Sequence, residues 1–407
     1  MSQPDNIILV NISGNDRPGI TAALMGVLAQ YDVRVLDISQ AMVHENLALG
    51  ILIKLADESH SAHVLKDLLF EAHTLDLRVR FQPVSLQEYQ GWVSGENQAR
   101  YVLTLLGRRV TAAQIARIAA VTTTHGLNIE DIVRLSARSP LHDEFAESRA
   151  CLELSLRGEP GNEDAMKSAF LSISQEMDID ISFQADTFYR RNRRLVVFDM
   201  DSTLIRQEVI DELAHEAGAG ATVAAITEAA MRGEIDFSES LKQRVAALKG
   251  LEQSVLERVA ERLTLTEGAE RLIKTLRMLG YKTAVISGGF SFFGERLKTQ
   301  LGLDYVYANE LTIAEGRLTG EVSGTIIDGE RKAELLAQIA TEENIALEQV
   351  IAVGDGANDL PMLRLAGLGI AFHAKPLVQQ SARQAISTIG LDGVLYLMGM
   401  NDAENPH

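Results

Sequence analysis

The 407-residue chain is short of cysteine and of basic residues. Cys151 is the only cysteine, which excludes a disulfide framework and indicates a reducing compartment. The 9 histidines are scattered, without the Cys/His spacing that holds zinc. Lys and Arg number 38 against 56 for Asp and Glu, and the net charge of −18 argues against nucleic acid or an anionic membrane as a partner.

Long apolar runs are also absent. No stretch reaches the roughly 18 consecutive apolar residues of a membrane helix, and the first residues, MSQPDN, lack the basic and apolar regions of a signal peptide. We therefore expect a cytoplasmic protein that does not insert into a membrane. A hydrophobic content of 46% with 23% charged residues is typical of folded proteins, and the length predicts about two or three domains.

Residues 1–84 are predicted to form a small α+β domain. Apolar patterning and turn residues give the order β-α-β-β-α-β, which is the ferredoxin-like arrangement. The expected strands and helices are 7–13, 20–31 (helix), 33–43, 47–55, 58–72 (helix) and 75–81. The polar stretch 85–99, which contains Gly91 and Gly95, is predicted to be a linker.

The same order of elements begins again in residues 100–186. Short stretches recur at matching places in the two copies. TAAL (21–24) corresponds to TAAQ (111–114), and VLDI (35–38) corresponds to IEDI (129–132). An internal duplication accounts for both observations.

Both copies resemble the ACT domain, a small regulatory module that binds amino acids. The match is best where DRPG (16–19) stands between the first strand and helix; the second copy has GRRVT (107–111) instead. The resemblance implies an amino-acid effector such as serine, and a homodimer. Asp16, Gly19 and Gly107 are the candidate regulatory residues, because glycine lets backbone N–H groups near a helix start approach a carboxylate. The alternative is that these glycines only form turns and the domains only dimerise.

Residues 187–407 contain short buried-type strands followed by polar residues. LVVF (195–198) leads into Asp199 and Asp201, and YKTAVIS (281–287) ends in Ser287, followed by Gly288 and Gly289. Ligands of open α/β sheets bind just outside the carboxyl ends of the strands. A hydroxyl followed by two glycines suits a phosphate group there.

A third such strand, 350–353, is followed by Asp355, Asn358 and Asp359. With Asp199 and Asp201 they bring four carboxylates to neighbouring strand ends. Two unit charges about 4 Å apart repel by about 4 kcal/mol at an effective dielectric near 20, against a domain stability of about 5–15 kcal/mol. We therefore expect a cation among them, and hard oxygen ligands favour magnesium.

These motifs resemble those of the haloacid-dehalogenase-type phosphatases. The matching stretches, in the family's order, are DMDST (199–203), SGG (287–289), Lys332 and GDGANDLPML (354–363). The resemblance implies an α/β fold with a doubly wound parallel sheet, preceded here by the two ferredoxin-like domains. Lys332 alone would be interpreted as a solvated surface residue.

The resemblance also implies a role for each site residue. Asp199 would be the nucleophile that forms an aspartyl phosphate, and Asp201 the acid and then the base. Ser287 and Lys332 would hold the phosphoryl oxygens. Magnesium would be bound by Asp199, the backbone carbonyl of Asp201 and Asp355, with Asp359 in support.

Between the first two motifs, residues 204–268 are helical in pattern, with helices expected near 206–217, 221–232, 238–249 and 252–262. This insertion resembles the small helical cap that closes over the site in this family. A cap selects the substrate and excludes water.

Two charged cap residues, Glu208 and Arg244, narrow the expected substrate. They are either a surface ion pair contributing about 0–1 kcal/mol, or they receive an ammonium and a carboxylate group. The resemblance favours the second interpretation and adds Met231, Phe237, Gly288 and Asn358 as substrate-binding residues. The expected reaction is hydrolysis of O-phospho-L-serine, the last step of serine biosynthesis. Transfer of the phosphoryl group to homoserine or another small alcohol, and an amino-acid-sensing regulator with weak phosphatase activity, remain alternatives.

Overall fold

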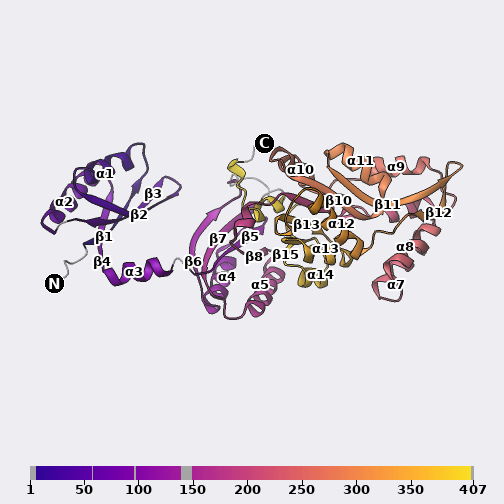
Figure 1. Cartoon of the computed structure of the whole chain (residues 1–407), viewed down its shortest axis with the longest axis horizontal. Helices are drawn as coiled ribbons and strands as arrows, with labels where there is room; N and C mark the ends of the chain where they lie inside the picture. The colour runs from indigo at the N-terminus through magenta and orange to yellow at the C-terminus, as the bar shows by residue number, and fades with distance from the viewer. Residues whose placement is uncertain (1–5, 57, 96–97, 139–148, 405–407) are drawn as a thin grey trace. The chain divides into compact units, whose positions relative to one another are not determined.

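The computed structural model describes residues 6–56, 58–95, 98–138 and 149–404. Contacts divide the chain into two compact units, Met1–Gln98 and Ala99–His407 (Figure 1). Within the described residues, none of the helices combines the length and the apolar character needed to span a membrane.

The first unit contains the predicted ferredoxin-like domain. Its four-stranded antiparallel sheet has the order β2-β3-β1-β4, and α1 and α2 bury their apolar residues against it. The elements are β1 (Ile7–Asn15), α1 (Ile20–Leu28), β2 (Val33–Val43), β3 (Asn46–Leu55), α2 (Glu58–Thr74) and β4 (Arg78–Val84). The prediction of this fold is confirmed.

The segment 85–99, predicted as a linker, contains the helix α3 (Leu86–Gly95). Ser85 and Glu88 start it: the backbone N–H of Ser85 donates to the Glu88 carboxylate (2.8 Å), and that of Glu88 donates to Oγ of Ser85 (3.2 Å). This is the capping box of a Ser-x-x-Glu sequence. The glycines that suggested a linker outweighed this signal in the sequence-based interpretation.

The second unit begins with the duplicate of the first domain. Its sheet has the equivalent order β6-β7-β5-β8, and α4 and α5 cover it. The elements are β5 (Arg100–Gly107), α4 (Ala112–Thr124), β6 (Leu127–Arg134), β7 (Ala150–Gly158), α5 (Glu163–Met177) and β8 (Asp180–Ala185). The ladder irregularity between Val35 and Asp37 in β2 recurs between Ile129 and Asp131 in β6. The duplication therefore extends to the backbone of the VLDI and IEDI stretches.

The remainder of the chain forms the predicted doubly wound sheet. Its strand order is β12-β11-β10-β9-β13-β14-β15, parallel except for β12. The strands are β9 (Leu195–Phe198), β10 (Lys282–Phe290), β11 (Tyr305–Ala314), β12 (Arg317–Ser323), β13 (Val350–Gly354), β14 (Leu368–Phe372) and β15 (Gln384–Ile386). The helices between and after them are α10 (Ala269–Met278), α11 (Ser291–Leu301), α12 (Gly329–Glu342), α13 (Leu360–Leu365), α14 (Pro376–Ser381) and α15 (Gly393–Leu397).

Strand β9 shows why the apolar run 195–198 marks the centre of this sheet. Leu195 and Val197 pack on the face covered by α12 and α13, whereas Val196 and Phe198 pack on the face covered by α10 and α11. All four side chains are completely buried. A central strand of a doubly wound sheet needs apolar residues on both faces, which produces a continuous rather than an alternating run.

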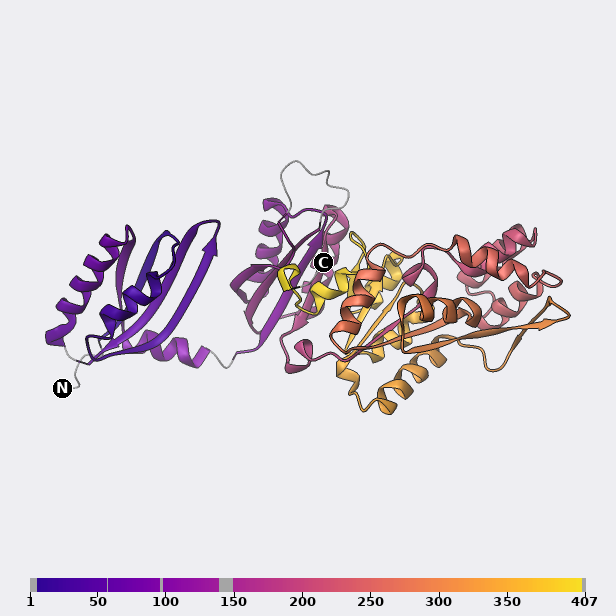
Figure 2. The same ribbon diagram turned by 90° about the horizontal axis from the view of Figure 1, so that it is seen from above.

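The cap is helical as predicted, with α6 (Val209–Glu216), α7 (Gly220–Met231), α8 (Phe237–Ala246) and α9 (Ser254–Arg262). Its two connections meet at a β-bridge between Ile205 and Leu265. The hairpin β11–β12 was not predicted; it extends the sheet beside the cap, and α8 contacts β12 (Figures 1 and 2).

The duplicate domain and the phosphatase-like domain share a buried boundary within the second unit. Leu106 and Cys151 belong to the same buried cluster as Tyr396. The Asp180 carboxylate accepts hydrogen bonds from the backbone N–H groups of Ser387 (2.8 Å) and Thr388 (2.9 Å). The two domains therefore form one packed body, although the sequence pattern separates them.

Candidate active site

The first site loop begins at the end of β9. The backbone N–H of Asp199 donates to the carbonyl of Val353 (2.9 Å), so the ladder with β13 continues up to this residue. Its carboxylate accepts the N–H of Met200 (2.8 Å). Ser202 then adopts a left-handed conformation (φ 55°), which turns the chain away from the sheet.

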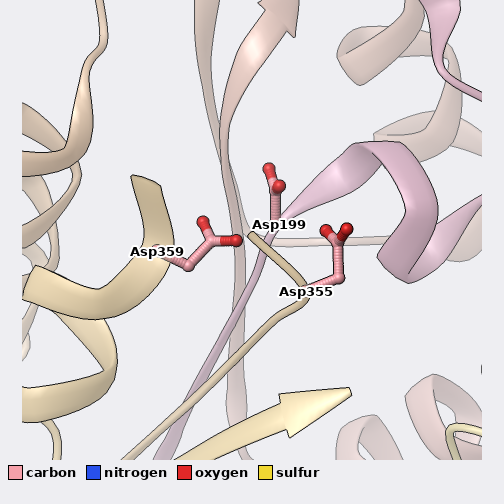
Figure 3. Close-up of side chains that lie close together, drawn as sticks. All are labelled: Asp199, Asp355 and Asp359. Carbon is pink, nitrogen blue, oxygen red and sulfur yellow. The ribbon is translucent and has the colours of Figure 1, made fainter. Parts of the chain in front are cut away.

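Asp199, Asp355 and Asp359 form an acidic cluster at the carboxyl ends of β9 and β13. One carboxylate oxygen from each lies within 4.8 Å of the others. Figure 3 shows the carboxylates of Asp199 and Asp355 side by side, with the Asp359 carboxylate directed toward Asp199. The predicted convergence of these side chains is therefore present.

The cluster is electrostatically unfavourable without a cation. Burial and then the charge of Asp199 raise the pKa of Asp355 to about 8 and that of Asp359 to about 6. Near neutral pH Asp355 therefore retains its proton unless a cation replaces it. A set of donors made only of carboxylate oxygens fits a hard divalent cation, so this site is suited to hold one.

Lys332 lies beneath the cluster, in the first turn of α12. Asp328 caps this helix by accepting the N–H of Arg331 (2.9 Å). The fully buried Nζ of Lys332 is 2.9 Å from Oδ1 of Asp199 and 2.6 Å from Oδ1 of Asp359. Burial alone would lower the pKa of Lys332, but the two carboxylates raise it overall, so the residue stays charged.

The loop Ser287-Gly288-Gly289 closes the site from β10. Oγ of Ser287 accepts the N–H of Gly289 (2.9 Å). A Cβ atom added to Gly288 would stand 2.7 Å from Cζ of Phe237, and one added to Gly289 would stand 2.5 Å from Oδ2 of Asp201. Neighbouring side chains therefore approach both glycines closely, and a larger residue at either position would have to displace them.

Asp201 is placed to carry a proton. Its carboxyl group accepts the N–H of Val209 at the start of α6 (3.3 Å). Burial, followed by the charges of Glu208 and Asp199, raises the pKa of Asp201 well above its usual range. A raised pKa lets a carboxyl group hold its proton to higher pH, as a general acid must. Its side chain is not part of the acidic cluster, so three of the four carboxylates expected to converge do so. The metal contact predicted for Asp201 was through its backbone carbonyl.

Glu208 and Arg244 face the same region from the cap. Oγ of Ser202 donates to Oε1 of Glu208 (2.7 Å). Desolvation and the charge of Asp199 raise the pKa of Glu208 although its side chain keeps contact with solvent. Among the described residues, Glu208 and Arg244 make no ion pair within 4.0 Å, so the surface-pair alternative is not realised.

The three remaining substrate-binding candidates differ in burial. Phe237 is half-buried against Gly288, and Asn358 is half-buried in the loop after Asp355. Met231 is 62% exposed, with its Sδ 3.7 Å from Nζ of Lys375, the residue before α14. Its role in substrate binding stays a prediction.

Ser202 was not singled out from the sequence. It stands inside the DMDST motif, where the two aspartates drew the interpretation, and its contact with Glu208 depends on a turn that the residue types do not reveal. Thr203 was also missed: its Oγ1 donates to Oδ1 of Asp355 (3.4 Å).

The regulatory candidates lie at the turns after β1 and β5. Asp16 and Gly19 are exposed, and Gly19 has φ 97°, a conformation that favours glycine. In the second copy a Cβ on Gly107 would be 3.3 Å from the carbonyl of Arg109. The next residue, Arg108, binds both carboxylate oxygens of Glu267 (2.8 and 2.6 Å). This turn is thus engaged with the catalytic domain.

Comparisons with known proteins agree with this architecture. Models of the ACT domain match residues 6–82 and 99–184, and the domain that carries the site is a haloacid dehalogenase-like hydrolase, whose model matches residues 196–364. A phosphoserine phosphatase of Streptomyces coelicolor is 42% identical over 401 residues, covering 98% of this chain and 93% of the relative. One from Mycobacterium tuberculosis is 40% identical, covering 98% and 94%. The chain therefore belongs to the phosphoserine phosphatase family.

Two solved structures are similar to a large part of the chain. A HAD family hydrolase from Salmonella enterica serovar Typhi has a TM-score of 0.64 and 32% identity, covering 73% of this chain and 98% of that one. A probable phosphoserine phosphatase from Vibrio cholerae, in unliganded form, has a TM-score of 0.58 and 34% identity, covering 75% and 87%.

Proposed function

We propose that the chain hydrolyses O-phospho-L-serine to L-serine and inorganic phosphate, the last step of serine biosynthesis. The observation that carries the proposal is the pair of opposite charges, Glu208 and Arg244, beside the acidic cluster. Glu208 interacts electrostatically with both Asp199 and Arg244, which supports a shared role for the three groups. The names of the full-length relatives support the same substrate.

The two cap charges account for the choice among phosphate esters. The ammonium group of serine would face Glu208, and its carboxylate would face the guanidinium of Arg244. A sugar phosphate would leave both charges without a partner. Sites built to pair polar groups reject such analogues by roughly 10⁴-fold.

Hydrolysis would proceed in two steps on Asp199. Its carboxylate attacks phosphorus, the bond from phosphorus to the serine oxygen breaks, and Asp201 gives that oxygen its proton. Asp201, now ionised, then accepts a proton from water while the water oxygen attacks phosphorus and releases Asp199. Lys332 and Ser287 would hold the phosphoryl oxygens during both steps.

Magnesium is the proposed metal. Asp199, Asp355 and the backbone carbonyl of Asp201 would hold it, and Asp359, which also binds Lys332, would support the site. Bound magnesium would offset the negative charge of the phosphoryl group. The raised pKa values of Asp355 and Asp359 support a cation at this place.

A phosphate-release screen over small phosphoesters, with and without magnesium, tests the proposal. We expect magnesium-dependent release that is fastest with O-phospho-L-serine and absent in the Asp199→Asn variant. Equal rates of phosphate release from glycerol phosphate and from O-phospho-L-serine would contradict the proposal that phosphoserine is the substrate. Adding homoserine tests the transferase alternative, because phosphohomoserine would then accumulate in place of free phosphate.

The proposed effector is serine bound at the turn of the first ACT domain, around Asp16 and Gly19. The proposed assembly is a homodimer. Calorimetric titration of L-serine into the Asp199→Asn protein, compared with a variant that also carries Asp16→Ala, tests the first point. Light scattering tests the second, and a monomeric mass would contradict it.

A further inference from the structure

The loop Ser287-Gly288-Gly289 interrupts the ladder between β10 and β11. Ile286 pairs with Tyr307 and Phe290 with Asn309, and the register shifts between these pairs. Three residues of β10, 287–289, therefore stand opposite Ala308 alone. Such a bulge turns Ser287 and the glycines out of the sheet, but it leaves backbone groups without their ladder partners.

The side chain of Asn309 supplies hydrogen bonds in place of some that the bulge removes from the ladder. Its Nδ2 donates to the carbonyl of Gly288 (2.8 Å), and its Oδ1 accepts the N–H of Ile327 (2.9 Å). Asn309 is only 2% exposed, so both bonds lie away from solvent. Each buried backbone group would be costly to leave unpaired.

The second partner leads directly to the lysine of the site. Ile327 precedes Asp328, the residue that caps α12, and Lys332 lies in the first turn of that helix. One amide group thus joins the loop of Ser287 to the start of the helix of Lys332. These two segments carry Ser287 and Lys332, the two groups proposed to hold the phosphoryl oxygens.

We propose that Asn309 is a positioning residue that sets the separation of Ser287 and Lys332 around the phosphoryl group. Its kinetic consequence rests on the proposed function; its structural consequence does not. Only a primary amide offers an uncharged donor and an acceptor at this spacing: aspartate lacks the donor, and leucine lacks both. Misplacing such groups by about 1 Å can cost about 10²-fold in rate.

Kinetics of Asn309→Asp and Asn309→Ala, with Thr283→Val as the matched control, test the inference. Thr283 is fully buried at the other end of β10, and its Oγ1 donates to Asp304 (3.1 Å). We expect kcat/KM for phosphoserine to fall about 10- to 100-fold in both Asn309 variants, with weaker inhibition by inorganic phosphate. The control should lose thermal stability but keep kcat/KM within about twofold. Equal kinetic losses in the control and the Asn309 variants would overturn the proposal.

Hydrogen exchange of the full chain without substrate provides a test that does not depend on activity. In Asn309→Ala we expect faster exchange in both 287–290 and 327–332, and in Thr283→Val in neither. Unchanged exchange in these two segments would overturn the proposal even if activity fell. If the wild-type protein releases no phosphate from phosphoserine, the proposed function fails, while the exchange result still decides the role of Asn309. Asn309→Ala also decides the matter if the charged variant does not fold.

Discussion

Arg108 binds Glu267 through two parallel hydrogen bonds (2.8 and 2.6 Å), across the boundary between the second ACT domain and the catalytic domain. Arg108 lies in the turn that corresponds to DRPG in the first copy. Glu267 lies just after Leu265, whose bridge to Ile205 closes the base of the cap. The turn whose residues 15–19 are exposed in the first copy therefore corresponds, in the second, to a turn that contacts the segment following the cap.

The Arg108–Glu267 pair should contribute measurably to stability. A double-mutant cycle with Arg108→Ala and Glu267→Ala, followed by chemical denaturation, should give a coupling free energy of about 0.5–1 kcal/mol, the upper range for partly exposed pairs. The hydrogen bond from Arg108 lowers the pKa of Glu267 below its ordinary 4.5. A carboxylate whose pKa is lowered in the folded state stabilises the protein fully at a pH above the unfolded-state pKa. This contribution is lost as the pH falls through the folded-state pKa.

The pair Arg117–Glu176 is the matched control, because it lies within the second ACT domain (2.5 Å) and is more exposed. We expect a smaller coupling free energy for it. A coupling for Arg108–Glu267 that is absent near neutral pH, or unchanged in strong acid, would contradict this prediction.

The metal-free acidic cluster should make stability depend on pH in the opposite direction. Burial and the neighbouring carboxylates raise the pKa of Asp355 from 3.8 to about 8. A carboxyl group with a raised folded-state pKa binds its proton more tightly in the folded state, so stability falls as the pH rises from 3.8 toward about 8. We expect the melting temperature in chelator to fall over this range, and less so in Asp355→Asn.

Magnesium should reverse this loss in the wild-type protein only. A ligand that binds only the folded state, at a concentration about 100 times its dissociation constant, raises the free energy of unfolding by about 2.7 kcal/mol. The Asp355→Asn variant lacks one proposed ligand, so its melting temperature should hardly respond to magnesium. An equal response of both proteins would remove Asp355 from the metal site. Calcium in place of magnesium is a useful comparison, because it tolerates more ligands and a looser geometry.

The fold was largely predictable because its signals are local. The apolar run 195–198 is long enough to indicate a strand buried on both faces, and the alternation of elements gave both ferredoxin-like domains. The hairpin of β11 and β12 was missed although Glu315 and Gly316 (φ 51° and 74°) form the kind of two-residue turn that joins antiparallel strands. The first strand of this hairpin, β11, also pairs in parallel with β10, which made the antiparallel hairpin harder to recognise in the sequence.

The site was predictable where chemistry is concentrated in short motifs and unpredictable where it depends on distant contacts. Asp199 and Asp355 follow buried strands, so their convergence could be expected. Lys332 depended on the resemblance, because a lysine in a first helical turn is ordinarily solvated. Asn309 could not have been found, since its importance comes from a bulge and from a partner, Ile327, that is remote in sequence.

Arg244 should discriminate between substrates rather than serve the chemistry itself. Its guanidinium is partly buried, which lowers its pKa, and nearby Glu208 opposes that effect. In Arg244→Ala we expect kcat/KM for phosphoserine to fall about 10- to 10²-fold, because a charge-assisted contact with the substrate carboxylate contributes about 1.5–3 kcal/mol. The rate with a small ester that lacks a carboxylate, such as phosphoethanolamine, should change far less. Equal losses with both esters would place Arg244 outside the substrate site.

Ser202 should act through Glu208, whose carboxylate accepts a hydrogen bond from the Ser202 hydroxyl (2.7 Å). In Ser202→Ala, Glu208 loses this partner, so we expect KM for phosphoserine to rise about 5- to 10-fold, which corresponds to about 1–1.4 kcal/mol and lies within the range of a single net hydrogen bond. KM for an ester without an ammonium group should not change. Ser202 has φ 55°, where serine and alanine are equally strained by their Cβ atom and glycine is not.

The Ser202→Gly variant therefore separates the hydroxyl from the backbone. Both variants lack the hydroxyl, so both should show the same rise in KM. Alanine keeps the Cβ that strains this backbone in the wild-type protein, whereas Ser202→Gly removes it and should relieve the strain. Glu208→Gln provides the reference for a fully weakened ammonium contact, and its effect should exceed that of either Ser202 variant. If Ser202→Gly had wild-type KM and Ser202→Ala did not, the loop conformation rather than the bond to Glu208 would be what matters at this position.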